Sequence, residues 1–256
     1  TANLLAAAAA RGARAPRVVV VSSQAAAGPA SSPTRPVREE DRPLPIEAYG
    51  RSKLQAEQAV ANYHGVVPVT IVRPSSVYGP RDRDFLRLFR QESRRIALHA
   101  VPRDHALSIV HVDDLVRALL LAGTVPDAVG RTYFVADERA ATWGELYDAI
   151  SALSRRAPLA VQIPSFLLRL AAAGGDLFNI LSGRATIVNH NKIALARPQW
   201  WLCDASRARS ELGWKAEMPL QQGLREAYTW YVDAGWLKPT SSAPEGSRAA
   251  TEEPEA

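Results

Sequence analysis

The chain has 256 residues, of which 47% are apolar, which suits one large α/β domain or one domain with a small additional lobe. It carries 31 basic and 26 acidic residues, and the arginines are spread along the chain, so the formal charge of +5 indicates a solvated surface and argues against a nucleic-acid partner. The single cysteine, Cys203, excludes intramolecular disulfides and paired-cysteine metal sites and is typical of a reducing, cytoplasmic setting.

Helices and strands alternate through the first half of the sequence. Helices are predicted over Asn3–Arg11, Ile46–Tyr63, Asp84–Arg95, from Asp113 or Asp114 as N-cap to Ala122, and over Trp143–Ser154 after the cap Thr142. Strands are predicted over Arg17–Ser23, Val67–Arg73, Leu107–Val112 and Thr132–Val135, and loops over Gln24–Ser32 and, exposed, over Pro33–Pro45. This order favours parallel βαβ units, with the valine-rich first strand buried on both faces.

The second half is mostly helical, with an irregular piece at Arg197–Asp204, and predicts a smaller lobe set on the sheet. No run of about 18 apolar residues occurs, so stable membrane insertion is not expected. The nearest case, Pro164–Leu181, predicts an amphipathic lid or packing helix, and a membrane-contacting helix is the alternative. The composition from Pro239 onward predicts a disordered tail.

Tyr49 and Lys53 are four residues apart on a predicted helix, so their side chains share one face. A free phenol has a pKa of about 10 and is a poor base at neutral pH, but a nearby ammonium group stabilises the phenolate. Such a tyrosine can exchange a proton with a substrate hydroxyl or carbonyl. Ser22 and Ser23 end a strand upstream, where a hydroxyl can hold the substrate oxygen.

Four motifs in this order resemble the extended short-chain dehydrogenase/reductase superfamily, in particular its NAD-dependent epimerase/dehydratase and 3β-hydroxysteroid dehydrogenase-like branches. They are VVSS at 20–23, YGRSK at 49–53, RPSSVYGP at 73–80 and HVDD at 111–114, and the resemblance runs from Asn3 to about Leu237. It implies a Rossmann-like parallel sheet with a small, mostly helical C-terminal substrate lobe. By this resemblance, residues 1–160 are a partial NAD(P)-binding domain with interleaved lobe segments, 161–238 mainly the lobe, and 239–256 the tail.

The resemblance also implies roles for single residues. Tyr49 is the acid/base, Lys53 tunes it and holds the nicotinamide ribose, and Ser23 matches the catalytic serine, with Ser22 as runner-up and cofactor contact. Pro74, Ser75, Ser76 and Val77 resemble the loop that lies against the nicotinamide of NAD or NADP. No metal is expected: the HVDD motif predicts that His111 ends a strand and an aspartate caps a helix. Trp200 and Trp201 are expected to pack in the lobe, or to line the pocket.

The sequence departs from the family's pattern in two places. No Gly-x-x-Gly-x-x-Gly fingerprint is present, and residues 1–5 resemble the family's fourth helix, so we expect a truncated chain in which the strand at Val18 is an exposed edge. Nucleotide-sugar members often carry an arginine where Leu107 stands, with Arg103 close but displaced. This difference favours an apolar, steroid-like or terpenoid-like alcohol or ketone over a nucleotide sugar.

We therefore expect an NAD(P)-dependent oxidoreductase or epimerase that acts on a secondary alcohol or ketone through Ser23, Tyr49 and Lys53. Its partners would be a small-molecule substrate and, as in many members of this superfamily, a second copy of the chain in a homodimer. The alternative is a truncated, non-catalytic protein that binds ligands or regulates through the cofactor fold. The sequence leaves open the substrate, the choice between NAD and NADP, and the choice among oxidation, epimerisation and dehydration.

Overall fold

A computed structural model describes residues 1–154, 158–164, 166–167 and 197–239, which form an α/β fold. Its central sheet is parallel, in the order β1-β2-β7, and consists of β1 (Val18–Val21), β2 (Val69–Pro74) and β7 (Thr132–Val135). The helices around it are α1 (Ala2–Ala9), α2 (Gln24–Ala27), α3 (Ala48–Ala61), α5 (Val112–Thr124) and α9 (Ser206–Leu212), with short 3-10 turns at Gly12–Arg14 and Pro126–Ala128. The predicted fold class is confirmed.

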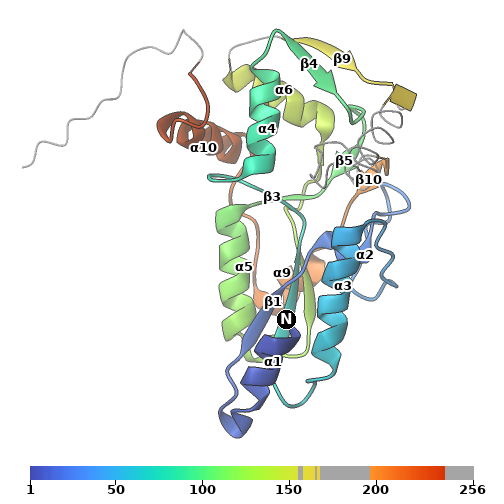
Figure 1. Cartoon of the computed structure of the whole chain (residues 1–256), viewed down its shortest axis with the longest axis vertical. Helices are drawn as coiled ribbons and strands as arrows, with labels where there is room; N and C mark the ends of the chain where they lie inside the picture. The colour runs from blue at the N-terminus through green and yellow to red at the C-terminus, as the bar shows by residue number, and fades with distance from the viewer. Residues whose placement is uncertain (155–157, 165, 168–196, 240–256) are drawn as a thin grey trace, which may run out of the picture.

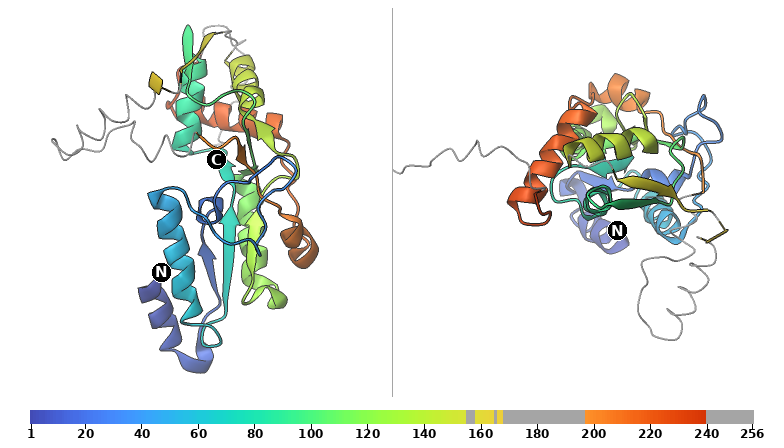
Figure 2. Two further views of the ribbon diagram at one scale, coloured as in Figure 1. Left: turned by 90° about the vertical axis from the view of Figure 1, so that its right-hand side faces the viewer. Right: turned by 90° about the horizontal axis from the view of Figure 1, so that it is seen from above.

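The central sheet is covered on both faces, because its valines alternate between two clusters of buried residues. Val20 packs with Leu5 of α1 and with the start of β2, whereas Val19 packs into a second cluster with Ala118 of α5. Figures 1 and 2 show α3 and α5 on opposite sides of the strands. β-Branched residues favour extended backbone, which is why these short apolar runs form strands.

Strand β1 departs from the prediction that it is buried on both faces. Val20 is buried, but Val21 is 45% exposed, and within the described residues β1 pairs with β2 alone. The prediction was wrong because burial of a strand depends on the neighbours on each side, which an apolar run does not specify.

A second lobe lies beyond the carboxyl ends of the central strands (Figure 1). Its helices are α4 (Arg83–Glu92), α6 (Trp143–Leu153) and α10 (Leu220–Asp233), which pack around Phe89, Leu146 and Tyr231. Its small sheets pair β3 (Ser76–Tyr78) with β6 (Ile109–His111) and β4 (Ile96–His99) with β9 (Leu159–Gln162). In a third sheet, β5 (Ala106–Leu107) lies between β10 (Trp200–Trp201) and β8 (Ala141–Thr142) and pairs with both.

The lobe is assembled from segments far apart in the chain. Residues 202–214, which follow the lobe strand β10, return to the sheet, where Leu202, Leu212 and Trp214 are buried in the same cluster as β7. The C-terminal helix α10 then packs in the lobe. The division into residues 1–160 and 161–238 stays a prediction.

Three local predictions were wrong. The segment 24–32 begins with a helical turn, α2, capped by Ser23. The single strand predicted at Leu107–Val112 is broken at Ser108 into β5 and β6, which pair with different strands. The N-cap of α5 is His111, whose ring accepts from the backbone N–H of Asp113, and not one of the two aspartates, which lie in the first turn.

Two predictions fall largely outside the described residues: the helix at Pro164–Leu181 and the tail after Pro239. The irregular segment Pro33–Pro45 is mainly surface, as expected, although Val37 is buried and pairs with Cys203. Within the described residues, every helix is too short or too polar to cross a membrane.

Candidate active site

Helix α3 begins next to Glu47, whose buried carboxylate caps it. The side chain accepts hydrogen bonds from the backbone N–H groups of Tyr49 and Gly50. A carboxylate at this position satisfies N–H groups that have no partner within the helix and interacts favourably with the helix dipole. The cap therefore holds Tyr49 in the first turn of α3.

Tyr49 and Lys53 lie side by side on α3, as their spacing predicts. Lys53 Nζ lies 5.5 Å from the centroid of the Tyr49 ring and donates a hydrogen bond of 3.1 Å to the carbonyl oxygen of Val21. Because Val21 is the last residue of β1, Lys53 connects α3 to the carboxyl end of the sheet. Tyr49 is 52% exposed, so a ligand can reach it.

A cavity of about 580 Å³ lies at the carboxyl ends of β1 and β2 and contains four of the predicted site residues, Ser23, Tyr49, Ser75 and Ser76. Ligands of open parallel sheets bind at this edge. The remaining lining residues are mainly apolar or aromatic and come from the lobe and from α2: Gln24, Ala25, Asp84, Val101, Leu107, Trp143, Pro198 and Trp201. Trp201 thus lines the pocket, whereas Trp200 packs against the sheet.

The two adjacent serines have different environments. Ser23 Oγ accepts a hydrogen bond of 3.2 Å from the backbone N–H of Ala25 and lies at the cavity. Ser22, by contrast, is buried, and its hydroxyl donates a hydrogen bond to the carboxylate of Glu57. Of the loop at 74–77, the two serines line the cavity, while Pro74 ends β2 and Val77 packs against the sheet cluster.

A buried ion pair, which the sequence analysis missed, ties α3 to the sheet. The guanidinium of Arg73 on β2 donates two hydrogen bonds, of 2.9 and 2.7 Å, to the carboxylate of Glu57 on α3. Arg73 also lies over the ring of Phe134, 5.4 Å from its centroid. No sequence spacing points to this pair, because its two residues are 16 positions apart and lie on different elements.

Tyr78, in the same motif as Ser75, is not a comparable acid/base. It is almost fully buried, and burial raises its pKa, with smaller contributions from nearby carboxylates. Its phenol therefore stays protonated at neutral pH. Tyr49 is the tyrosine that lines the cavity within the described residues.

The HVDD motif connects the sheet to the C-terminal segment. Asp114 is buried, accepts hydrogen bonds from the backbone N–H groups of Glu217 and Met218, and pairs with Arg117. His111, Asp113 and Glu226 bring ligand atoms within 4.8 Å of one another, but His111 already serves as the cap of α5. The prediction that the site has no metal stays a prediction.

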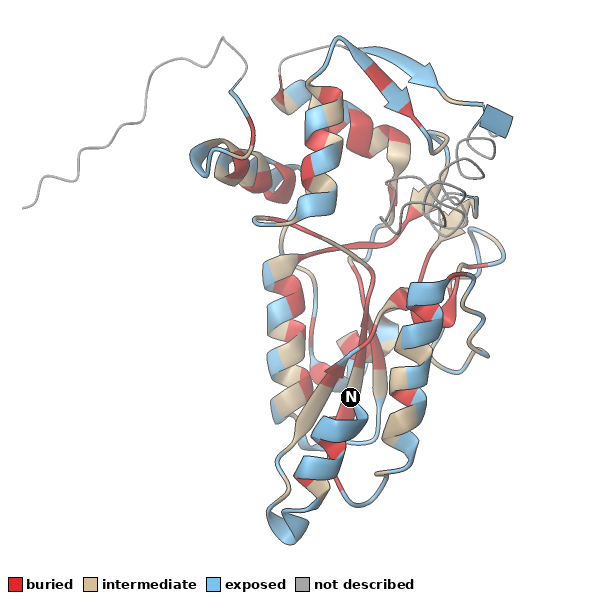
Figure 3. Ribbon diagram, viewed as in Figure 1, coloured by how far each residue is buried: buried red, intermediate tan, exposed pale blue. Residues whose placement is uncertain are grey.

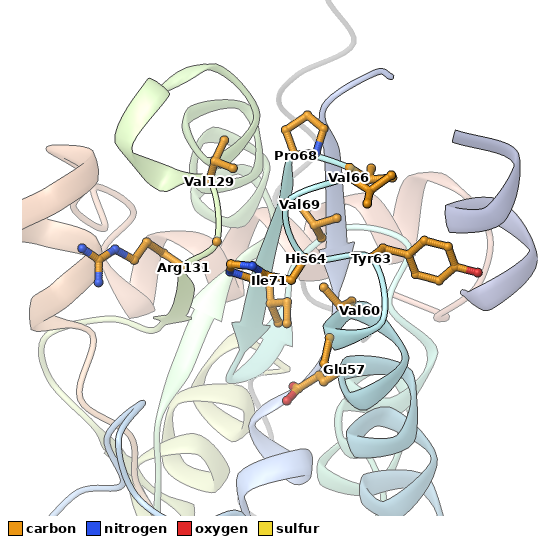
Figure 4. Close-up of a pocket in the computed structure, with 14 residues that line it drawn as sticks. Glu57, Val60, Tyr63, His64, Val66, Pro68, Val69, Ile71, Val129 and Arg131 are labelled. Carbon is orange, nitrogen blue, oxygen red and sulfur yellow. The ribbon is translucent and has the colours of Figure 1, made fainter. Parts of the chain in front are cut away.

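A second cavity, of about 480 Å³, lies at the opposite end of the strands (Figure 4). It is formed by the end of α3, the loop at 62–68, the start of β2 and residues 129–131. Because ligands of open α/β sheets bind outside the carboxyl ends of the strands, we assign the chemistry to the cavity at Tyr49.

Residues 1–136 match the model of the NAD dependent epimerase/dehydratase family. Among curated proteins, the chain is similar to a UDP-glucose 4-epimerase of Vibrio cholerae, with 26% identity over 222 residues, 85% of this chain and 64% of that protein. It is also similar to a ceramide reductase of Caulobacter vibrioides, with 28% identity over 196 residues, 75% of this chain and 59% of that protein. The chain thus spans less than two thirds of the length of either relative.

Among solved structures, the fold is similar to a UDP-glucuronic acid 4-epimerase from Bacillus cereus, determined in complex with UDP-glucuronic acid and NAD. The TM-score is 0.71, with 20% identity, over 91% of this chain and 66% of that one. At this level of identity the likeness establishes the fold alone.

Proposed function

The chain belongs to the NAD dependent epimerase/dehydratase family, and we propose that it carries the proton-transfer half of an NAD(P)-dependent reaction at a secondary alcohol or ketone. The observation that supports this most directly is the Lys53 ammonium beside the ring of Tyr49, at a cavity that also contains Ser23. The superfamily assigned from the four sequence motifs is confirmed. The catalytic roles are our proposal.

In this proposal Tyr49 takes the proton of a substrate hydroxyl, or returns it to a carbonyl oxygen. The ammonium group of Lys53 lies beside the ring of Tyr49, and its hydrogen bond to the Val21 carbonyl holds it in place. Ser23 holds the substrate oxygen beside Tyr49. When substrate fills the cavity, the apolar walls formed by Val101, Leu107 and the indole rings exclude water, which strengthens these interactions.

The residues at the cavity fit the nicotinamide end of the cofactor. Ser75 Oγ is buried at the cavity and finds no hydrogen-bond partner among the described residues, so it is available to a carboxamide group. Lys53 and Tyr49 fit the ribose hydroxyls. When bound, the nicotinamide supplies the hydride acceptor. NAD is the cofactor of the Bacillus cereus structure, and we propose NAD or NADP here.

For the substrate we propose an apolar secondary alcohol or ketone. The similarity to a ceramide reductase and to a UDP-glucose 4-epimerase supports two different classes. The cavity favours an apolar substrate of the first class, because Leu107, Trp143 and Trp201 give its lobe side an apolar surface. In turnover assays, UDP-glucose is the substrate with which apolar alcohols and ketones are compared.

Replacing Tyr49 by phenylalanine tests the proposal. The change removes one hydroxyl, so turnover of alcohols with NAD or NADP should fall by about 100-fold or more. NADH binding, followed by tryptophan fluorescence, should weaken far less, because Lys53 still holds the ribose. Tyr63→Phe is the matched control, because Tyr63 lies just after the far end of α3 and donates to the Ala2 carbonyl. Equal turnover of the two variants would remove Tyr49 from the mechanism. NADH binding without turnover in the unaltered chain would support the non-catalytic alternative.

A further inference from the structure

The strands β4 and β9 present an apolar face to solvent. They pair in parallel, and the register places Ile96 opposite Leu159 and Leu98 opposite Val161. These four side chains are between 41% and 66% exposed. On β4 they alternate with buried residues such as Ala97, whereas all four residues of β9 are exposed. Figure 2 shows the strands in full view from above, and Figure 3 shows exposed residues along both of them.

The exposed side chains of β4 are apolar, whereas those of a solvated strand are polar. On a sheet with one buried face, the outward positions are ordinarily polar, because exposed aliphatic side chains order water without packing. Here every outward position of β4 is aliphatic, and two further exposed apolar residues, Phe166 and Leu167, follow β9. An exposed apolar surface on two paired strands is typical of an interaction site.

The charge around this face has one sign. Arg94 and Arg95 directly precede β4, and both are exposed. Residues 93–102 contain two arginines, residues 154–167 contain two more, and neither segment contains an aspartate or glutamate. Of the carboxylates near the strands, Glu92 of α4 is buried against His99 of β4, and Asp148 of α6 pairs with Arg103.

An apolar face with a rim of arginines is complementary to a surface that is itself apolar and anionic. A second copy of this chain is disfavoured, because a two-fold contact through this face would bring the same arginines together. Lipid bilayers with anionic headgroups offer both properties at once. We propose that the face of β4 and β9, with Arg94 and Arg95, docks the protein on an anionic membrane surface. This inference does not depend on the catalytic role of Tyr49.

Vesicle co-sedimentation of the full 256-residue chain tests the proposal. Binding should be strong to phosphatidylcholine vesicles that contain about one third phosphatidylglycerol, weak to phosphatidylcholine alone, and weaker at high salt. Leu98→Ser with Leu159→Ser should lower the partition coefficient by on the order of tenfold or more. Arg94→Gln with Arg95→Gln should lower it by about fivefold per arginine, for the anionic vesicles only.

The matched controls are a leucine and an arginine pair elsewhere. Leu120→Ser, on α5, replaces a leucine that is 63% exposed, and Arg11→Gln with Arg14→Gln replaces two exposed arginines near the N-terminus. Both should leave binding unchanged. Absence of vesicle binding, or equal losses in the control variants, would overturn the proposal.

Two further measurements distinguish membrane docking from two alternatives, in which this face is covered by the chain itself or by a second copy of it. If the leucine variant lowers the Tm by several degrees, the face is covered within the chain, which contradicts docking. If it converts a dimer to a monomer in sedimentation velocity without affecting vesicle binding, the face is a contact between copies, and the proposal fails. An unchanged Tm and oligomeric state together with lost vesicle binding support it.

Discussion

Among single residues, Glu57 has the largest influence on how the candidate site is assembled. Its carboxylate accepts from Arg73 on β2 and from Ser22 at the end of β1, while its own helix carries Tyr49 and Lys53. The side chains of both charged partners are less than a tenth exposed. A buried pair of this kind gives a defined geometry, because each charge is costly without the other.

Replacing Glu57 by alanine should therefore destabilise the protein strongly. The change leaves the guanidinium of Arg73 buried without its counter-charge, and we expect a loss of about 3–5 kcal/mol in the free energy of unfolding, measured by urea denaturation. Arg87→Gln breaks a pair with Asp84 in which both side chains are mainly exposed, and should change the free energy by no more than about 0.5 kcal/mol. Similar values for the two variants would show that the buried pair does not hold α3 to the sheet.

At the scale of elements, the close contact between α2 and α3 places Ser23 beside Tyr49. The two helices meet at Gly50, where an added Cβ would lie 2.2 Å from the carbonyl oxygen of Ala25. No real Cβ approaches a backbone oxygen so closely, so this contact requires glycine. The residue next to Tyr49 thus sets the separation of the two helices.

Gly50→Ala should force α2 and α3 apart. We expect a loss of roughly 1–3 kcal/mol in the free energy of unfolding, despite the better helix propensity of alanine, and weaker NADH binding. Gly123→Ala in α5 is the control, because its Cβ would make an ordinary contact of 3.5 Å with Val19. It should stabilise the protein by up to about 1 kcal/mol. In thermal unfolding, the Tm of Gly50→Ala should therefore be lower than that of the unaltered protein, and the Tm of Gly123→Ala higher. A stabilised Gly50 variant would refute the close packing of α2 and α3.

At the scale of the whole molecule, the sheet and the lobe depend on chain segments that pass between them. The segment after β10 brings Cys203 into the sheet cluster, where it pairs with Val37 of the long irregular segment. Burial raises the pKa of the Cys203 thiol to about 12, opposed in part by a hydrogen bond to Ser108. The thiol is therefore neutral at physiological pH and becomes accessible only when these segments separate.

This burial predicts a pH dependence of stability. The pKa of the Cys203 thiol is raised in the folded state. Its contribution to the free energy of unfolding is therefore present in full below the thiol pKa in the unfolded chain, about 8.5, and is lost as the pH rises toward 12. The free energy of unfolding should fall over this range more steeply for the unaltered protein than for Cys203→Ala. Thiol labelling at pH 8 should be slow until denaturant is added. Rapid labelling of the native protein, or identical pH profiles, would contradict the buried position.

Much of the site could be predicted because it depends on short-range spacing. The valine runs predicted β1 and β2, and the four-residue interval predicted that Tyr49 and Lys53 share a face, since helix periodicity is local. The family was also confirmed from ordered motifs. Periodicity cannot say which of two adjacent serines reaches a cavity, because that choice depends on a glutamate 35 residues away from Ser22.

What the sequence by itself determined was the α/β class, the place of each main strand and the pairing of Tyr49 with Lys53. What only the tertiary structure decided was the exposure of Val21, the break at Ser108, the cap at His111 and the buried Glu57–Arg73 pair. The physical reason is the range of the forces involved. Backbone propensity and helical spacing act between residues close in the chain, whereas burial and charge pairing are set by neighbours that only the folded chain brings together.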